Sequence, residues 1–208
     1  MARELSTYGA KIIACGRSEE KLARAKSEVP EVQWIGCDVT TKAGREKLLE
    51  FSLEQGGSID MLVNNAGRAS RYFFTKSPEI ETAIQDDLAI NFVAPVLLAH
   101  QFVSALASSG GTLVNVTSGL AQVPLSIEPS YCAAKAALRS MTMSLRVRLR
   151  DQGIRVVEVA YPAVDSPFQQ GHAPEGAITP EKAATEALKG IATGKEEVYV
   201  GMARTLRL

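Results

Sequence analysis

The sequence has few of the residues that build metal sites, disulfide frameworks or nucleophilic triads. Its 208 residues include only three cysteines and two histidines. Cys15, Cys37 and Cys132 are far apart and form no CxxC motif, a pattern typical of reduced thiols rather than of a disulfide framework. Neither His100 nor His172 has a neighbour at metal-ligand spacing. We therefore expect no metal site and no catalytic triad built on histidine.

The chain also lacks an excess of charge of either sign. Lysine plus arginine and aspartate plus glutamate each number 23, so the formal net charge is zero. This balance argues against binding nucleic acid through a basic field. No apolar run approaches the roughly 20 residues of a membrane-spanning helix, and the first residues lack the apolar core of a signal peptide. We therefore expect a cytoplasmic protein that binds neither nucleic acid nor membrane.

Short apolar runs alternate along the chain with stretches of helical periodicity. The expected strands are 11–15, 32–39, 59–63, 112–116, 154–160 and 197–200, and the expected helices are 18–29, 41–55, 79–108, 130–152 and 180–191. The strand runs are nearly unbroken in apolar character, which is typical of a parallel sheet buried on both faces. This alternation predicts a single α/β domain over residues 1–208, with a doubly wound parallel sheet of the Rossmann type.

Tyr131 and Lys135 are four residues apart at the start of an expected helix, so they lie on one helical face. A phenol has an unperturbed pKa of about 10, which is too high for a base near neutrality. A nearby ammonium favours the phenolate and lowers that pKa. The pair therefore predicts a tyrosine that acts as general acid or base. Taken alone, the motif also fits an ordinary helix surface.

Further polar residues stand near the ends of other expected elements. Ser118 follows the strand at 112–116, Asn-Asn-Ala-Gly at 64–67 follows the strand at 59–63, and Asn91 lies within the long helix. Open α/β sheets bind ligands outside the carboxyl ends of their strands. An asparagine pair before glycine is by itself a plain turn, but these features in this order indicate a ligand site.

With these motifs the whole chain resembles the short-chain dehydrogenase/reductase family, of the classical type. The resemblance rests on residues 64–67, on Asn91 and Ser118, and on the Tyr-x-x-x-Lys motif of Tyr131 and Lys135. Within the family, the chain is most similar to the DltE-type oxidoreductases, through residues 118–121, 194–197 and 200–203.

The resemblance implies a role for each of four residues. Tyr131 would exchange a proton with the substrate oxygen, and Lys135 would bind the nicotinamide ribose and lower the pKa of Tyr131. Ser118 would position the substrate oxygen, and Asn91 would hold a water in a proton relay that ends at Lys135. The implied reaction interconverts a small-molecule carbonyl and an alcohol by hydride transfer with a nicotinamide dinucleotide.

Arg17 bears on which dinucleotide the chain would use. It follows the expected strand at 11–15, where NAD-preferring members of the family carry an acidic residue for the ribose hydroxyls. A guanidinium there suits a 2′-phosphate instead. We therefore expect NADP(H) to be preferred over NAD(H), although Arg17 also fits a solvated charge at a helix start.

Other cofactor contacts are implied by position in the family pattern. Adenine would lie near the end of the strand at 32–39, and the nicotinamide carboxamide would lie beyond the strand at 154–160. Tyr161 is bulkier than the proline usual at its position and would reshape the nicotinamide pocket. The remaining implied cofactor residues are Asp38, Val39, Asn65, Ala66, Gly67, Val164 and Ser166.

The chain departs from the family at its amino end. Residues 1–10 look like the second half of the helix that follows the family's glycine-rich turn, and no GxxxGxG occurs. We therefore expect a gap between the strands at 11–15 and 59–63, with backbone groups whose lost pairing costs roughly 1 to 3 kcal/mol each. A fragment of a longer enzyme, a gap filled by another segment or subunit, and a diverged member without normal dinucleotide binding are all open.

Two functions follow as expectations. The first is an NADP(H)-dependent oxidoreductase that works as a homo-oligomer, a dimer or a tetramer, through the helices around residues 80–108 and 130–150. The alternative is a non-redox relative, an isomerase or dehydratase or a ligand-binding protein, without normal dinucleotide binding.

Overall fold

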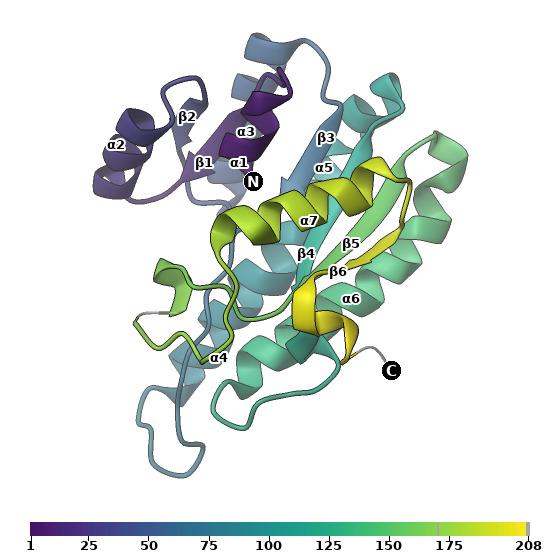
Figure 1. The fold of residues 1–208 in the computed structure, drawn as a ribbon. Coiled ribbons are helices and arrows are strands. Elements are labelled where there is room, and N and C mark those ends of the chain that lie inside the picture. Colours follow the sequence, from purple (N-terminus) through teal and green to yellow (C-terminus); the bar gives the residue numbers. More distant parts are fainter. Residues whose placement is uncertain (170, 207–208) are drawn as a thin grey trace.

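Strands and helices alternate in a computed structural model that describes residues 1–169 and 171–206 (Figure 1). The strands are β1 (Ile13–Gly16), β2 (Gln33–Gly36), β3 (Met61–Asn64), β4 (Thr112–Ser118), β5 (Arg155–Tyr161) and β6 (Glu197–Tyr199). The α-helices are α1 (Ala2–Thr7), α2 (Glu19–Glu28), α3 (Lys42–Gly56), α4 (Ile80–Leu88), α5 (Ala94–Ser109), α6 (Pro129–Leu149) and α7 (Pro180–Ala192). A π-helical turn, Ala89–Val93, joins α4 to α5.

The strands form two parallel sheets. β1 pairs with β2, while β3, β4, β5 and β6 pair in that order. As the sequence predicts, β1 and β3 are not neighbours, and no ladder joins them among residues 1–169 and 171–206. The prediction of a Rossmann-like α/β fold with parallel strands is confirmed.

Strand β4 lies inside the larger sheet, and all seven of its residues are buried. Leu113 packs in a cluster with Phe102 and Leu106 of α5, whereas Val114 and Val116 pack in a second cluster with residues of α7. Figure 1 shows α7 crossing one face of the sheet, with α5 and α6 on the other. Since alternate residues of a strand face opposite sides, this layering explains the nearly unbroken apolar pattern.

The small sheet is attached to the larger one through side chains rather than through a ladder. One buried cluster contains Leu62 of β3 and Leu98 of α5. The same cluster contains Ile35 of β2, Val39 from the turn after β2, and Leu48 of α3. Both sheets therefore share one apolar core.

Strand β2 ends at Gly36, before the end at Val39 that the sequence pattern predicts. The carboxylate of Asp38 accepts hydrogen bonds from the backbone N–H of Thr40 at 2.9 Å and from its hydroxyl at 2.7 Å. An aspartate that binds the backbone two residues further on forms a turn. This turn ends the strand and fixes the carboxylate of Asp38 at its carboxyl end.

The helical stretch from Ile80 to Ser109 is long and apolar enough to cross a membrane, by length and composition alone. The core helix of an α/β fold meets the same criterion. Here Leu98, Phe102 and Leu106 of this stretch pack in the core cluster beneath the sheet. The absence of a membrane partner stays a prediction.

Candidate active site

Helix α6 carries the predicted acid/base residue and its activator in its first two turns. Pro129 is the first helical residue, a position where a missing N–H breaks no helical hydrogen bond. Tyr131 is 7% exposed and Lys135 is 3% exposed, so both polar groups lie inside the protein. The chemistry of this site is therefore governed by a few fixed partners rather than by water.

Ser118, the last residue of β4, brings a second hydroxyl to Tyr131. The Ser118 side chain lies close enough to Tyr131 to lower the pKa of the phenol, and its hydroxyl lies 3.5 Å from the carbonyl of Tyr161. The Ser118 Oγ also accepts a hydrogen bond from the backbone N–H of Leu120 at 3.1 Å. The parallel register places Ser118 beside Tyr161, the last residue of β5. Ser118 therefore lies near Tyr131 at the carboxyl ends of the strands, where open α/β sheets bind ligands.

Asn91 is fully buried in the π-helical turn between α4 and α5. Its Nδ2 donates to the carbonyls of Arg68 at 2.8 Å and of Asp87 at 2.9 Å. Pro95, four residues further on, has no N–H to donate to the carbonyl of Asn91. Such π-helical turns occur often at functional sites. The turn holds the Asn91 amide in a fixed orientation facing the loop that follows β3.

Gly67 lies where that loop passes closest to the site. A Cβ atom at this position would lie 2.7 Å from Asn91 Oδ1, 3.7 Å from Lys135 Nζ and 3.8 Å from Phe168 Cε2. Real Cβ atoms essentially never approach a neighbour below 3.0 Å. Gly67, Asn91 and Lys135 therefore meet at one place, and only glycine fits there.

The ammonium of Lys135 has one acceptor among the residues that the structure describes. Its Nζ donates to the carbonyl of Val116 in β4 at 2.8 Å, and it lies 5.9 Å from the centroid of the Tyr131 ring. Burial lowers the pKa of Lys135 from 10.5 to about 8, because the charged form loses its hydration. An ammonium has three N–H donors, so this group can bind further acceptors.

The expectation that Lys135 lowers the pKa of Tyr131 is wrong for this arrangement. Burial raises the pKa of Tyr131 above its usual value of 10. The nearby Ser118 side chain opposes this shift in the pKa of Tyr131, while the charges of Glu128 and Asp87 add to it. Desolvation of the phenolate dominates because the ring is almost wholly enclosed. Tyr131 therefore keeps its proton at neutral pH.

Phe168 is part of the site, although it is not among the residues that the sequence motifs predict. It lies in a short 3-10 helix, Pro167–Gln169, in the loop between β5 and α7. Its ring centroid is 5.8 Å from that of Tyr131, with the two planes inclined by 56°. No local periodicity or motif marks this residue, because its position depends on how the loop folds back over the sheet.

The residues predicted to bind the adenosine end lie at the ends of β1 and β2. Arg17 and Asp38 form an ion pair with 3.7 Å between Nη1 and Oδ2, and the Arg17 side chain is 67% exposed. Hydrogen bonds from Thr40, and the charge of Arg17, hold the pKa of Asp38 below its usual value. The Val39 side chain lies in the apolar core instead, and its carbonyl accepts a 2.9 Å hydrogen bond from Arg45.

The other predicted cofactor residues follow β3 and β5. Asn65 and Ala66 are exposed directly after β3. Val164 and Ser166 are half-buried after β5, and Val164 forms an isolated parallel bridge with Ile178. Because neighbouring parallel strands end at the same edge of a sheet, these four residues belong to the edge that carries Ser118.

The chain belongs to the short-chain dehydrogenase family, since the family profile described as short chain dehydrogenase matches residues 1–176. It is therefore an oxidoreductase of that family, and the predicted resemblance is confirmed. The uncharacterized oxidoreductase DltE of Bacillus subtilis (strain 168) is 38% identical over 204 residues, which cover 95% of this chain and 81% of that protein.

Solved structures of the same family have the same fold. A short-chain dehydrogenase/reductase of unknown function from Caenorhabditis elegans, solved with cofactor, is 26% identical with a TM-score of 0.83, over 97% of this chain and 88% of that one. A short chain dehydrogenase from Burkholderia cenocepacia J2315, solved in complex with NADP, is 29% identical with a TM-score of 0.79, over 94% and 79% of the two chains.

Replacing Gly67 with alanine should displace Asn91. The new Cβ would overlap Asn91 Oδ1, and overpacking of a filled interior typically costs about 1 to 3 kcal/mol. We expect the free energy of unfolding, measured in urea, to fall by that amount. Gly56→Ala is the control, since its nearest neighbour, Ile59 Cδ1, is 4.0 Å away. Equal stability of the two variants would contradict the prediction.

Replacing Lys135 with methionine should stabilise the fold at pH 7. The lowered pKa means that the charged form costs the folded state on the order of 3 kcal/mol at this pH. Leaving the Val116 carbonyl unpaired offsets part of this gain. The advantage of Lys135→Met over the natural chain should shrink as the pH rises from about 8 towards 10.5, because the natural lysine then loses its charge in both states.

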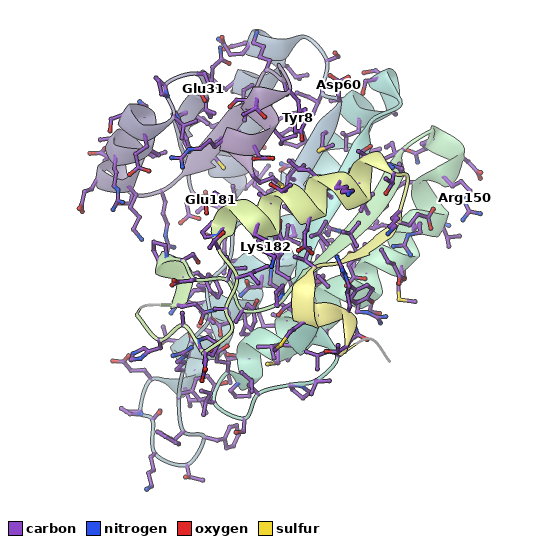
Figure 2. All side chains as sticks on the ribbon, viewed as in Figure 1. Tyr8, Glu31, Asp60, Arg150, Glu181 and Lys182 are labelled. Atoms are coloured by element: carbon purple, nitrogen blue, oxygen red, sulfur yellow. The ribbon has the colours of Figure 1, made fainter. Side chains whose placement is uncertain are left out.

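Urea unfolding at pH 7 and pH 10 measures this effect. Lys182→Met is the control, since Figure 2 shows Lys182 at the amino end of α7, where its side chain is exposed. A variant at position 135 that is less stable than the natural chain at pH 7 would show that the charge is not the dominant cost.

Proposed function

We propose that the chain is an NADP(H)-dependent oxidoreductase that interconverts a carbonyl and an alcohol, with Tyr131 as acid/base. One observation carries the proposal: Ser118, Tyr131 and Lys135 are all buried at one site, where the Lys135 ammonium lies 5.9 Å from the centroid of the Tyr131 ring and the Ser118 side chain influences the Tyr131 phenol. Two hydroxyls at one point can bind a single substrate oxygen, and the nearby cation favours negative charge there.

The residues of the site fit a nicotinamide dinucleotide. Lys135 has N–H donors left for ribose hydroxyls after its hydrogen bond to Val116. Gly67 lets the loop after β3 approach Asn91 and Lys135 closely, and the exposed Arg17 offers a guanidinium to a 2′-phosphate. When bound, the dinucleotide would supply or accept the hydride. Arg17 favours NADP(H) over NAD(H), as does the NADP complex of the related Burkholderia protein.

The proton state of Tyr131 favours the direction of carbonyl reduction. With its pKa raised by burial, the phenol stays protonated at neutral pH and can donate to a carbonyl oxygen. Ser118 gives a second hydrogen bond to the same oxygen, which orients the carbonyl group. As the carbonyl carbon gains a hydride, the Tyr131 proton would move to the oxygen, and a proton passed through Lys135 would restore the phenol.

We also propose that the protein forms a homo-oligomer. Large apolar side chains are exposed on the π-helical turn, on α5 and on α6; they are Val93, Leu97, Met143 and Val147. Such a face suits a subunit interface, and it belongs to the helices expected to form one.

Replacing Tyr131 with phenylalanine should abolish turnover without unfolding the protein. Loss of the hydroxyl removes the proton donor, and general acid–base catalysis typically contributes about 10² to 10⁴ in rate. The assay is NADPH oxidation with a panel of aldehydes and ketones, followed by the loss of nicotinamide absorbance. Tyr72→Phe is the control, because Tyr72 is a second buried tyrosine.

Two results would count against this proposal. Retained activity in Tyr131→Phe would remove the acid/base role of the residue. A folded natural chain that binds a small molecule but shows no cofactor-dependent reaction would favour the non-redox alternative.

Replacing Arg17 with alanine should weaken NADPH binding selectively. Hydrogen bonds between charged groups contribute about 1.5 to 3 kcal/mol, so the Kd of NADPH should rise about 10- to 100-fold while that of NADH changes little. Nicotinamide fluorescence and thermal shift together measure binding. Arg24→Ala is the control, an exposed arginine on α2 that pairs with Glu28. Equal weakening of both dinucleotides would rule out a 2′-phosphate contact.

A further inference from the structure

Asp87 is a fully buried carboxylate that none of the roles above uses. It lies on α4, one helical turn before Asn91, and its exposed fraction is 0%. An ionised carboxylate in a protein interior is costly unless it is paired and hydrogen-bonded. The partners of Asp87 therefore indicate what the structure gains from holding it there.

Asp87 joins three segments of the site. From the loop after β3, Ser70 donates to its carboxylate through the hydroxyl at 2.9 Å and the backbone N–H at 3.2 Å. From the same loop, Arg68 Nε lies 3.5 Å from Oδ1. From the first turn of α6, the Ser130 hydroxyl donates to Oδ2 at 2.5 Å. Both carboxylate oxygens are thereby engaged.

Two of these partners, Ser130 and Arg68, are adjacent to residues of the proposed site. Ser130 immediately precedes Tyr131. Arg68 immediately follows Gly67, and its backbone N–H and carbonyl face the amide of Asn91 at 3.4 Å and 2.8 Å. The backbone carbonyl of Asp87 is the other acceptor for the Asn91 amide, at 2.9 Å. One side chain thus ties α4, the loop after β3 and α6 together around the site.

We propose that Asp87 is a positioning residue, which sets the placement of Tyr131 through Ser130 and that of Asn91 through Arg68. This inference rests on the proposed function, since placement matters for catalysis only if Tyr131 and Asn91 take part in it. Misplacement of a reacting group by about 1 Å costs about 100-fold in rate. The Asp87 carboxylate of α4 is bound by the loop after β3 and by α6, and these contacts limit such movement.

The neighbouring residue supplies a matched control. Asp86 is also an aspartate of α4 and also pairs with Arg68, but its side chain is 47% exposed. Among the described residues its side chain forms a hydrogen bond with Arg68 but none with Ser130 or with the Asn91 amide. Asp86→Asn therefore removes a charge from the same helix and the same arginine without touching the proposed link to Tyr131.

The experiment compares Asp87→Asn, Ser130→Ala and the double variant with the natural chain in NADPH-dependent carbonyl reduction. We expect kcat to fall about 10- to 100-fold in each single variant, with the KM of the carbonyl nearly unchanged and Asp86→Asn within about 2-fold. The double variant should lose little more than Asp87→Asn alone, because the Ser130 hydroxyl acts through the carboxylate that Asp87→Asn removes. Ser130→Thr, which keeps the hydroxyl, should restore the rate.

A second measurement needs no turnover. In protein labelled with 13C at the tyrosine ring, the Tyr131 resonance is assigned by its loss in Tyr131→Phe. We expect Asp87→Asn and Ser130→Ala to shift this resonance, and Asp86→Asn to leave it in place.

The two measurements separate the failure of this inference from that of the proposed function. No carbonyl reduction by the natural chain, with the resonance still shifted by Asp87→Asn, would overturn the proposed function and keep the placement of Tyr131 by Asp87. An unshifted Tyr131 resonance, additive losses in the double variant, or a KM effect equal to the kcat effect would overturn the role of Asp87.

Discussion

Strand β4 is buried on both faces and paired on both edges, and the geometry of the candidate site at its carboxyl end depends on this burial. Its backbone is paired with β3 on one side and β5 on the other, so its register cannot slip without turning apolar side chains away from the core. That register places Ser118 at the sheet edge and presents the Val116 carbonyl to Lys135. The geometry of the site is therefore a consequence of how the core packs.

A second consequence of this packing is that the buried polar groups of the site need hydrogen-bond partners within the protein, because water does not reach them. Lys135, Asn91 and Asp87 are each at most 3% exposed, and each is held by backbone or hydroxyl groups of other elements. The same desolvation moves the two principal proton-bearing groups in opposite senses, lowering the pKa of Lys135 and raising that of Tyr131. Burial, more than any single charge, sets the protonation states at the site.

Local patterns in the sequence predicted the type of nearly every element. Tyr131 and Lys135 form a helical spacing, and Ser118 follows an apolar run, so these patterns indicated one site. The roles of these residues and of Asn91 came from the resemblance to the family and stay predictions. Phe168 and the Asp87–Ser130 hydrogen bond join residues far apart in the chain, and nothing in their immediate neighbours marks them. The direction of the Tyr131 pKa shift was mispredicted for a related reason, because enclosure depends on the whole fold.

The residues proposed to select the dinucleotide and those proposed to transfer the proton belong to different sheets. Arg17 and Asp38 follow the strands of the two-stranded sheet, while Ser118 ends a strand of the four-stranded one, and a cluster of apolar side chains joins the two. Apolar contacts have no strict geometry. Substitutions around Arg17 and Asp38 therefore leave the strand register of the four-stranded sheet unchanged. On the proposed roles, substitutions at Arg17 would change the preference for one dinucleotide over the other in descendants of such a chain while the geometry around Tyr131 is kept.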